Sequence, residues 1–205
     1  MTVDEMLARL GYRLDDEDAG RFTEAVKLGA LNVVQDVVAG TVTTSLLRVL
    51  HNTVNLTCSN DGNALPADYF RYVGGELYKL SPVKWVTKLS EDNLGVLDSS
   101  LTKGTDKDPV CYVWGDKIYL KINLSTYGKN GSKLKLYYVK EPTTLISGGT
   151  CEIASVLHPY VVDWAESYLR KTYKYGSLEE ADKMNLYAEE RIKVISEQYK
   201  TGALL

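Results

Sequence analysis

The feature of this sequence that most constrains its fold is a change of hydrophobic period along the chain. Residues 1–50 and 151–205 carry apolar residues at helical spacing, whereas residues 51–150 alternate apolar and polar residues in short runs between Gly, Pro, Asn and Asp. A period near 3.6 residues is typical of amphipathic helices, and a period of two is typical of half-buried strands. The sequence therefore predicts an α+β fold, with an antiparallel helical bundle built from both termini and an inserted antiparallel β-sheet or sandwich region over residues 51–150.

Capping signals mark the first two helices. Thr2 followed by Glu5 has the pattern of a capping box, and Gly11 predicts the end of that helix. We expect the acidic residues 15–18 to form a solvated loop that supplies the next N-cap, and a second helix over 21–39 that Gly40 ends. Its apolar residues form two adjacent stripes, which predicts contacts on two sides: Phe22, Val26, Gly29, Val33 and Val37 form one, and Leu31, Val34 and Val38 form the other.

The C-terminal residues predict a helical hairpin. Pro159 suits the first turn of a third helix, where its missing N–H costs little. Gly176 then provides a C-cap, and Ser177 with Glu180 forms a second capping box that begins a helix running to about Lys200. Two long helices joined without slack are expected to pack antiparallel.

The central residues predict a β-meander. Val110–Trp114 and a return strand over 118–124 flank a two-residue turn, Gly115-Asp116, and Leu134–Tyr138 is the next strand. Gly74-Gly75 is interpreted as a turn. Weaker strand candidates are 54–57, 69–73, 76–80 and 83–88, and 90–97 is a candidate helical turn.

Composition and motifs exclude several functions. The 205 residues carry a formal net charge of −3, so there is no basic footprint for gripping a phosphate backbone. Cys58, Cys111 and Cys151 lie far apart without CxxC spacing, which argues against disulfides and zinc and favours small apolar filler in a reducing compartment. No apolar run approaches the roughly 20 residues of a membrane span, and the acidic N-terminus does not resemble a secretory signal. We therefore expect a soluble protein made in the cytosol, with no membrane partner.

Catalytic chemistry is not predicted. The two histidines are interpreted as structural, His158 as a surface or capping residue at a helix start and His51 as a packing residue. No nucleophile elbow, phosphate loop or dinucleotide fingerprint is present in the sequence. The sequence thus predicts a protein that is not an enzyme and that has no metal and no cofactor.

Tyrosine is the one residue type in excess, with 15 Tyr against 2 Phe. Tyr offers a large contact area with a polar end, which suits protein–protein surfaces. Stacking of single-stranded nucleic acid would need a positive groove as well, and the chain is acidic. Four tyrosines in the C-terminal helices are therefore candidate subunit contacts: Tyr168, Tyr175, Tyr187 and Tyr199.

With these segments in hand, the layout resembles the head–tail connector, or adaptor, proteins of tailed bacteriophages over nearly the full length. The resemblance rests on the order and spacing of several short motifs. They are the helical segments 2–11 and 21–32, Leu65-Pro66-Ala67-Asp68-Tyr69-Phe70-Arg71 at the entry into the β insertion, Leu134-Lys135-Leu136-Tyr137-Tyr138-Val139-Lys140-Glu141-Pro142 at its exit, and His158-Pro159-Tyr160 with Trp164-Ala165 in the closing hairpin.

The resemblance implies a structural subunit of a ring, commonly of twelve copies, that joins the capsid portal to the tail at the head–tail junction of the virion, after assembly in the host cytoplasm. DNA would pass through the central channel without sequence readout. The implied partners are further copies of the chain, the portal protein and tail proteins such as nozzle, stopper or tail-tube components. The implied portal-binding residues are Thr201, Gly202, Ala203, Leu204 and Leu205, and the implied tail-facing residues are Trp114, Gly115, Asp116, Asn130 and Gly131. The β section is longer than in the compact connectors, which leaves the tail type open.

A second interpretation is a β-rich carbohydrate- or protein-binding module on a helical stalk. It predicts a concave aromatic site on the sheet, formed from Tyr112, Trp114 and Tyr119.

Overall fold

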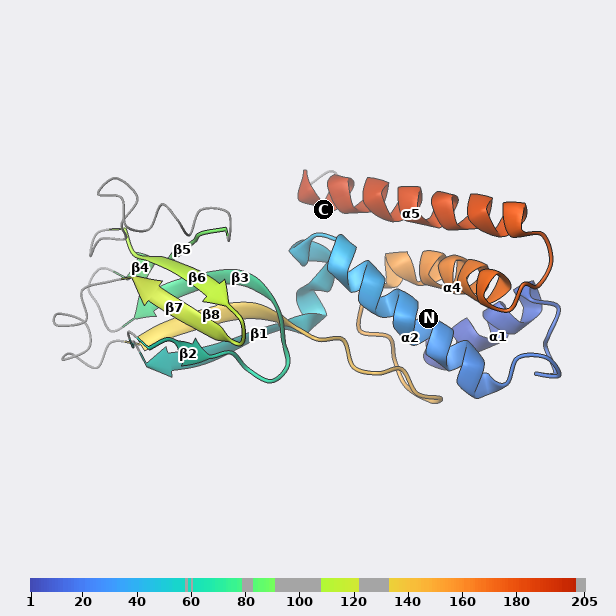
Figure 1. The fold of residues 1–205 in the computed structure, drawn as a ribbon, viewed down its shortest axis with the longest axis horizontal. Coiled ribbons are helices and arrows are strands. Elements are labelled where there is room, and N and C mark those ends of the chain that lie inside the picture. Colours follow the sequence, from blue (N-terminus) through green and yellow to red (C-terminus); the bar gives the residue numbers. More distant parts are fainter. Residues whose placement is uncertain (58, 60, 79–82, 91–107, 122–132, 202–205) are drawn as a thin grey trace. The chain divides into compact units, whose positions relative to one another are not determined.

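The computed structural model describes residues 1–57, 59, 61–78, 83–90, 108–121 and 133–201. The fold is α+β, and the chain divides into two compact units (Figure 1). The helical unit comprises Met1–Leu50 and Glu141–Leu205, and the β unit comprises His51–Lys140.

The helical unit is arranged around α4, which contacts α1, α2 and α5 and lies between α2 and α5 in Figure 1. Its segments 1–50 and 141–150 are joined by side chains, since Asn32 and Gln35 donate hydrogen bonds to the carbonyls of Leu145 and Thr143. The helices are α1 (Val3–Arg13), α2 (Glu24–Thr41), α4 (His158–Thr172) and α5 (Leu178–Lys200), with 3₁₀ turns η1 (Thr44–Leu50) and η3 (Ser155–Leu157).

The predicted helix starts are largely confirmed. Thr2 and Glu5 form both halves of a capping box, and the Ser177 hydroxyl accepts a hydrogen bond from the Glu180 backbone N–H. Pro159 lies in the first turn of α4, and Gly176 precedes α5 with a φ of 74°. These signals act within three or four residues, which is why the sequence alone reveals them.

The predicted ends of the first two helices are wrong. Gly11 and Gly40 lie inside α1 and α2, which continue to Arg13 and Thr41. A glycine ends a helix by taking a positive φ, and neither residue does so. The second helix also begins later than predicted, at Glu24, with Thr23 as its N-cap.

The two predicted apolar stripes of α2 are buried to different degrees. Leu31, Val34 and Val38 are at most 2% exposed, whereas Val33 and Val37 are 43% and 44% exposed. The helix contacts two neighbours, α1 and α4, as predicted, but the second stripe is not buried along its full length.

The β unit contains two four-stranded sheets, in the orders β1-β8-β3-β4 and β2-β7-β6-β5. They share a buried apolar cluster that includes Leu77, Cys111, Ile118, Leu134 and Leu136. Strand pairs are antiparallel except β5–β6, which is parallel. The strands are β1 (His51–Thr57), β2 (Asn63–Ala64), β3 (Tyr69–Tyr78), β4 (Lys84–Trp85), β5 (Thr87–Lys88), β6 (Val110–Trp114), β7 (Lys117–Lys121) and β8 (Lys133–Lys140).

The central strands are predicted better than their pairing. The β6–β7 hairpin forms as expected, with Gly115 at a φ of 59°. The meander is wrong, because β8 pairs with β1 and β3 in the other sheet. Gly74-Gly75 is not a turn either: both residues lie inside β3, where the register with β8 shifts between Tyr72 and Gly74. Alternation identifies a strand, but its partner depends on long-range packing.

Candidate interaction surfaces

His158 has a structural environment. His158 is buried, in contrast to the expected surface or capping role. The Met1 amino group lies 3.0 Å from Nδ1, and Nε2 lies 2.9 Å from the Ile153 carbonyl oxygen. Burial lowers the pKa of His158, so the imidazole is neutral and joins the chain start to the approach to α4. Within the described residues, no three His, Cys, Asp or Glu side chains are grouped to hold a metal ion, and no helix is long and apolar enough to cross a membrane.

The two described cysteines are buried and free. Burial raises the pKa of the Cys111 thiol to about 11, so the reactive thiolate is scarce at neutral pH. Burial also raises the pKa of Cys151, whose thiol donates to the Gln35 side-chain oxygen at 3.4 Å. Cys58 lies outside the described residues. Both positions fit the interpretation as apolar filler.

Asp16 overturns the expectation of a fully solvated acidic loop. It is 7% exposed and accepts hydrogen bonds from the backbone N–H groups of Arg21 and Phe22 at 2.7 and 2.9 Å. The Lys27 ammonium lies 3.1 Å from the Asp16 carboxylate and 2.6 Å from the Asp16 carbonyl oxygen. Burial acts to raise the pKa of Asp16, but the two N–H donors and Lys27 outweigh it and hold that pKa below its usual value. Asp16 thus organises the approach to α2, while Thr23 caps the helix.

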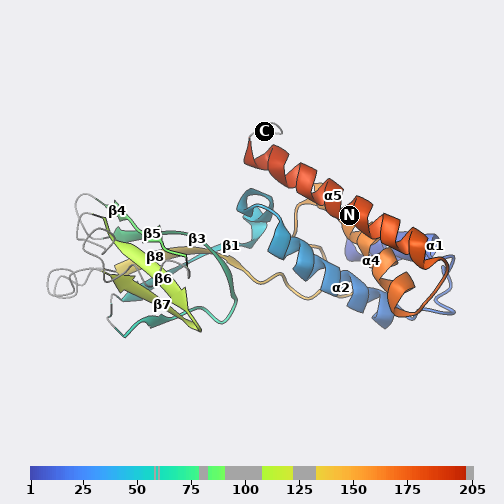
Figure 2. The same cartoon turned by 45° about the horizontal axis from the view of Figure 1, so that its top comes forward.

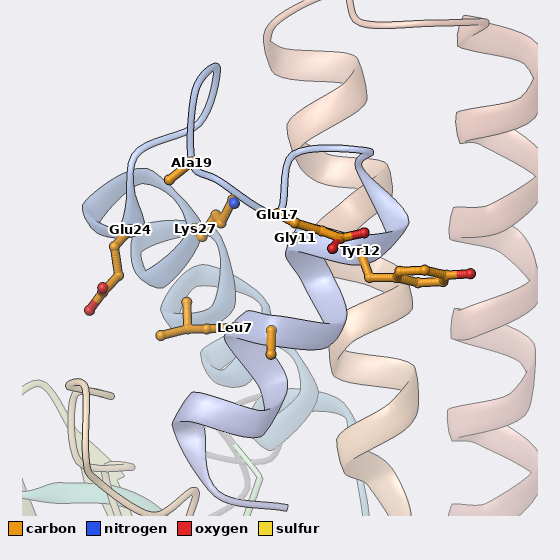
Figure 3. Close-up of a pocket in the computed structure, with 8 residues that line it drawn as sticks. Leu7, Gly11, Tyr12, Glu17, Ala19, Glu24 and Lys27 are labelled. Atoms are coloured by element: carbon orange, nitrogen blue, oxygen red, sulfur yellow. The ribbon is translucent and has the colours of Figure 1, made fainter.

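A hollow of about 300 Å³ lies beside this pair, between α1 and α2 (Figure 3). Its lining comes from Leu7, Ala8, Gly11, Tyr12, Glu17, Ala19, Glu24 and Lys27. The Lys27 ammonium in this lining is already paired with Asp16, and Figure 3 shows the Tyr12 ring extending away from the hollow. A Cβ at Gly11 would come within 3.3 Å of both the Asp16 carbonyl oxygen and the Lys27 ammonium. These two close contacts explain why a glycine stands inside α1.

An ion network joins α1 to α4. Arg13 lies 3.0 Å from Asp163 and 3.1 Å from Glu166, and Arg170 lies 2.9 Å from Glu166. Arg170 also donates to the Arg13 carbonyl oxygen. All four side chains serve packing between helices, so this cluster holds the unit together and does not form a site.

The tyrosines expected at subunit contacts occupy different environments. Tyr168 and Tyr187 are 38% and 49% exposed, on α4 and α5. Tyr199 is half-buried on α5. The Tyr175 ring packs within the unit, at 5.8 Å from the Phe22 ring and under the Arg21 guanidinium at 4.2 Å. Thr201 is exposed just beyond α5, and Gly202–Leu205 lie outside the described residues.

The tip of the β6–β7 hairpin is exposed. Trp114 is 61% exposed, and Gly115 and Asp116 are exposed beside it. Asn130 and Gly131 lie outside the described residues. Tyr112 and Tyr119 stack on each other, with ring centroids 5.0 Å apart. These residues thus present a single exposed indole at the hairpin tip.

A second hollow, of about 290 Å³, lies on the other sheet of the β unit. Its lining includes Trp85, which is 68% exposed, and Tyr137, whose ring centroid lies 6.2 Å from that of Trp85. Gly74 opens the hollow, because a Cβ there would meet nothing within 4 Å. The remaining lining residues are His51, Asn52, Thr53, Val73 and Tyr138. Sequence reasoning missed this site, although an exposed Trp85 beside the buried Val86 is consistent with strand alternation.

The comparisons with known proteins agree with a role in assembly. The family model described as SU10 adaptor protein matches residues 1–202. No curated protein matches this chain. Since the family match spans almost the whole chain, the chain belongs to the SU10 adaptor protein family, a family of phage head–tail adaptors, and is a structural component of the virion that interacts with other phage head and tail proteins.

Proposed function

We propose that this protein is a subunit of a closed ring that joins the capsid portal to the tail. The resemblance to phage head–tail connectors implies about twelve copies in the ring. The observation that carries the proposal is the family match over residues 1–202. In this proposal the bundle built from both termini assembles the ring, and the C-terminal residues from Thr201 onward bind the portal.

The exposed side chains support a division of labour between the two units. The helical unit leaves aliphatic and tyrosine side chains exposed on α2 and α5, including Val33, Val37 and Tyr187. The β unit leaves two indoles exposed, Trp85 and Trp114. Trp is enriched among the residues that dominate binding energy at protein interfaces. The β unit is therefore the proposed tail-facing surface.

The charge of the chain supports passage of DNA through the ring. A net charge of −3 gives no general attraction for phosphates. A basic wall would hold the DNA and slow its transit, whereas a near-neutral or acidic wall lets it slide. Assembly in the host cytoplasm, before incorporation at the head–tail junction, completes the proposal.

The test is assembly with the portal protein of the same phage. Light scattering after size exclusion, with and without portal, should give a portal-bound multimer of this chain, and electron microscopy of the product should show a ring. Truncation after Lys200 should abolish portal binding without changing the circular-dichroism spectrum. A chain that stays monomeric with portal present contradicts the proposal.

A second candidate function, a carbohydrate- or protein-binding module, is favoured by the hollow beside Trp85. Its aromatic walls and the polar groups of Asn52 and Thr53 are the groups that bind sugar rings and extended peptides. A glycan array and a titration with tail proteins distinguish the two ligand classes. Loss of binding on Trp85→Ala, with retention on Trp114→Ala, would assign the ligand to this hollow.

A further inference from the structure

Two outward surfaces of the helical unit remain without a partner in the described chain. The first, the α2 stripe, consists of Val33, Asp36 and Val37; both valines are more than two-fifths exposed. The second, the α5 stripe, consists of Tyr187, Arg191 and Val194; Tyr187 is 49% and Val194 48% exposed. Spacings of three, four and seven residues place the members of each stripe on one face of their helix.

The two stripes lie on different flanks of the unit. α4 contacts both helices, and α2 and α5 each turn a separate buried face inward, with Val34 and Val38 on α2 and Ala188 and Ile192 on α5. Because the stripes face different flanks, a twofold contact between two copies cannot use both stripes of both copies at once. They fit a head-to-tail contact, in which one surface of each copy meets the other surface of the next copy.

The two stripes also lie at the same height. The Thr43 backbone N–H donates to the Ser196 hydroxyl at 2.9 Å, which brings the ends of α2 and α5 level. Both helices run in the same direction (Figures 1 and 2). At a rise of about 1.5 Å per residue, Val33 lies about 15 Å before that bond and Tyr187 about 14 Å before it. A rotation about an axis along these helices, without axial shift, would therefore bring the two stripes level, which a closed ring requires.

The charges on the stripes are complementary. Arg191 donates to the Tyr187 hydroxyl at 3.3 Å but forms no ion pair with a described residue, whereas Lys193 on the same helix pairs with Glu189 at 2.7 Å. Asp36 likewise forms no ion pair with a described residue. Burial, and then the nearby Glu141, raises the pKa of Asp36, so a cation brought beside it would stabilise its carboxylate.

We propose that the α2 stripe of one copy packs against the α5 stripe of the next copy, with Asp36 beside Arg191, and that this contact repeats around the ring. The proposal rests on the proposed function and deepens it, because it names the surfaces through which the copies meet. Val33 and Val37 would then cover Tyr187 and Val194, and the Arg191 guanidinium would gain a carboxylate partner that none of the described residues of its own chain supplies.

Disulfide trapping tests the geometry. In a Cys58→Ser background, where Cys111 and Cys151 are buried, the pair Val33→Cys with Tyr187→Cys should give a ladder of multimers under mild oxidation on the portal. Each single variant should give no ladder. The matched control is Tyr12→Cys with Tyr187→Cys, since Tyr12 is 70% exposed but lies on α1. Dimers from a single variant would indicate a twofold contact and overturn the proposal.

Charge reversal tests the chemistry. Asp36→Lys and Arg191→Glu should each weaken assembly at least about tenfold, because like charges then face each other across the contact. Combining the two should restore assembly to near that of the unaltered chain. Lys193→Glu, on the same helix but outside the α5 stripe, is the control that should assemble normally. Melting curves confirm that each variant is folded.

The outcomes separate this proposal from the proposed function. If the unaltered chain forms rings on the portal but the cysteine pair gives no ladder or the charge variants assemble normally, the stripes are the wrong surfaces and the adaptor role stands. If the unaltered chain forms no multimer with portal, both proposals fail.

Discussion

The helical unit and the β unit both bury an apolar core, but they add different contacts to it. In the helical unit, whose core includes Leu10, Leu31 and Val161, charged and polar side chains from distant parts of the sequence also meet, as Arg13 does with Asp163 and Asn32 with the Leu145 backbone. In the β unit, β8 is hydrogen-bonded to β1 on one side and β3 on the other, over a shared apolar cluster. Specific charged and polar contacts therefore supplement burial in the helical unit, and continuous backbone pairing supplements it in the β unit.

This difference matters for assembly. Charged contacts fix one arrangement of helices, because a buried charge without its partner costs several kcal/mol. Such a unit suits a ring, in which every copy must present the same two surfaces. A sheet tolerates varied residues on its solvent face, so exposed groups such as Trp85 and Trp114 can serve recognition with little cost to the fold.

The largest expected loss of stability comes from removing a buried charged contact in the helical unit. Asp16→Ala removes the carboxylate that neutralises the buried Lys27 ammonium, which keeps only the backbone carbonyl oxygen of residue 16, and it leaves two backbone N–H groups without their acceptor. It should cost about 3–5 kcal/mol. With Trp85 and Trp114 replaced by Phe, the fluorescence of Trp164 reports unfolding of the helical unit alone. Asp18→Ala is the exposed control and should change stability by less than about 0.5 kcal/mol.

The same residue predicts a dependence on pH. Because the folded pKa of Asp16 lies below its usual value, its stabilising contribution is complete above the unfolded pKa of about 3.9 and is lost as pH falls through the folded pKa. Unfolding of the Trp164 reporter between about pH 5 and pH 2 should show this loss. An Asp16→Asn variant that keeps the full acid dependence would contradict the assignment.

The next largest loss of stability is expected in the apolar cluster of the β unit. Leu136→Ala removes a fully buried side chain from the shared cluster and should cost about 2–5 kcal/mol. A reporter with Trp164 replaced by Phe should show the shift through Trp85 and Trp114, and the Trp164 reporter should move less. Equal shifts in both reporters would mean that the two units unfold together and that the contrast does not extend to stability.

A smaller effect comes from the network between α1 and α4. Arg13 is partly exposed, so Arg13→Ala should cost about 1–3 kcal/mol. Burial raises the pKa of Asp163 and Arg13 opposes that rise, so the variant should raise this pKa further. An acid with a raised folded pKa destabilises the fold as pH rises through that value, and the variant should therefore lose more stability at pH 7 than at pH 4. A loss independent of pH would contradict this account.

The smallest effect compares two adjacent glycines of β3. A Cβ at Gly75 would lie 3.1 Å from the Tyr72 hydroxyl and 3.2 Å from Leu134, whereas a Cβ at Gly74 would meet nothing within 4 Å. Gly75→Ala should cost about 1–2 kcal/mol by overpacking, and Gly74→Ala should be nearly neutral. Chemical denaturation of the two variants measures the difference, and equal costs would argue against the open hollow at Gly74.

The parts of the fold that sequence reasoning predicted are those set by neighbouring residues. The capping box at Thr2 and the turn at Gly115 depend on contacts within a few positions. The strand partner of β8 and the burial of Asp16 depend on residues that are distant in sequence. The hollow beside Trp85 was missed for the same reason, since Gly74 and Tyr137 come together in its lining only when β3 pairs with β8. The position of Gly40 inside α2 depends on its backbone angle, which the residue type alone does not determine.

The first and last strands of the β unit lie side by side, with His51 opposite Val139. The two points at which the chain enters and leaves the β unit are therefore adjacent strand residues. An inserted domain whose ends lie close together can be replaced by another with the same end spacing without changing the fold of the unit that carries it. If the β unit faces the tail as proposed, phages that join one kind of capsid to different tails would need to change only this unit.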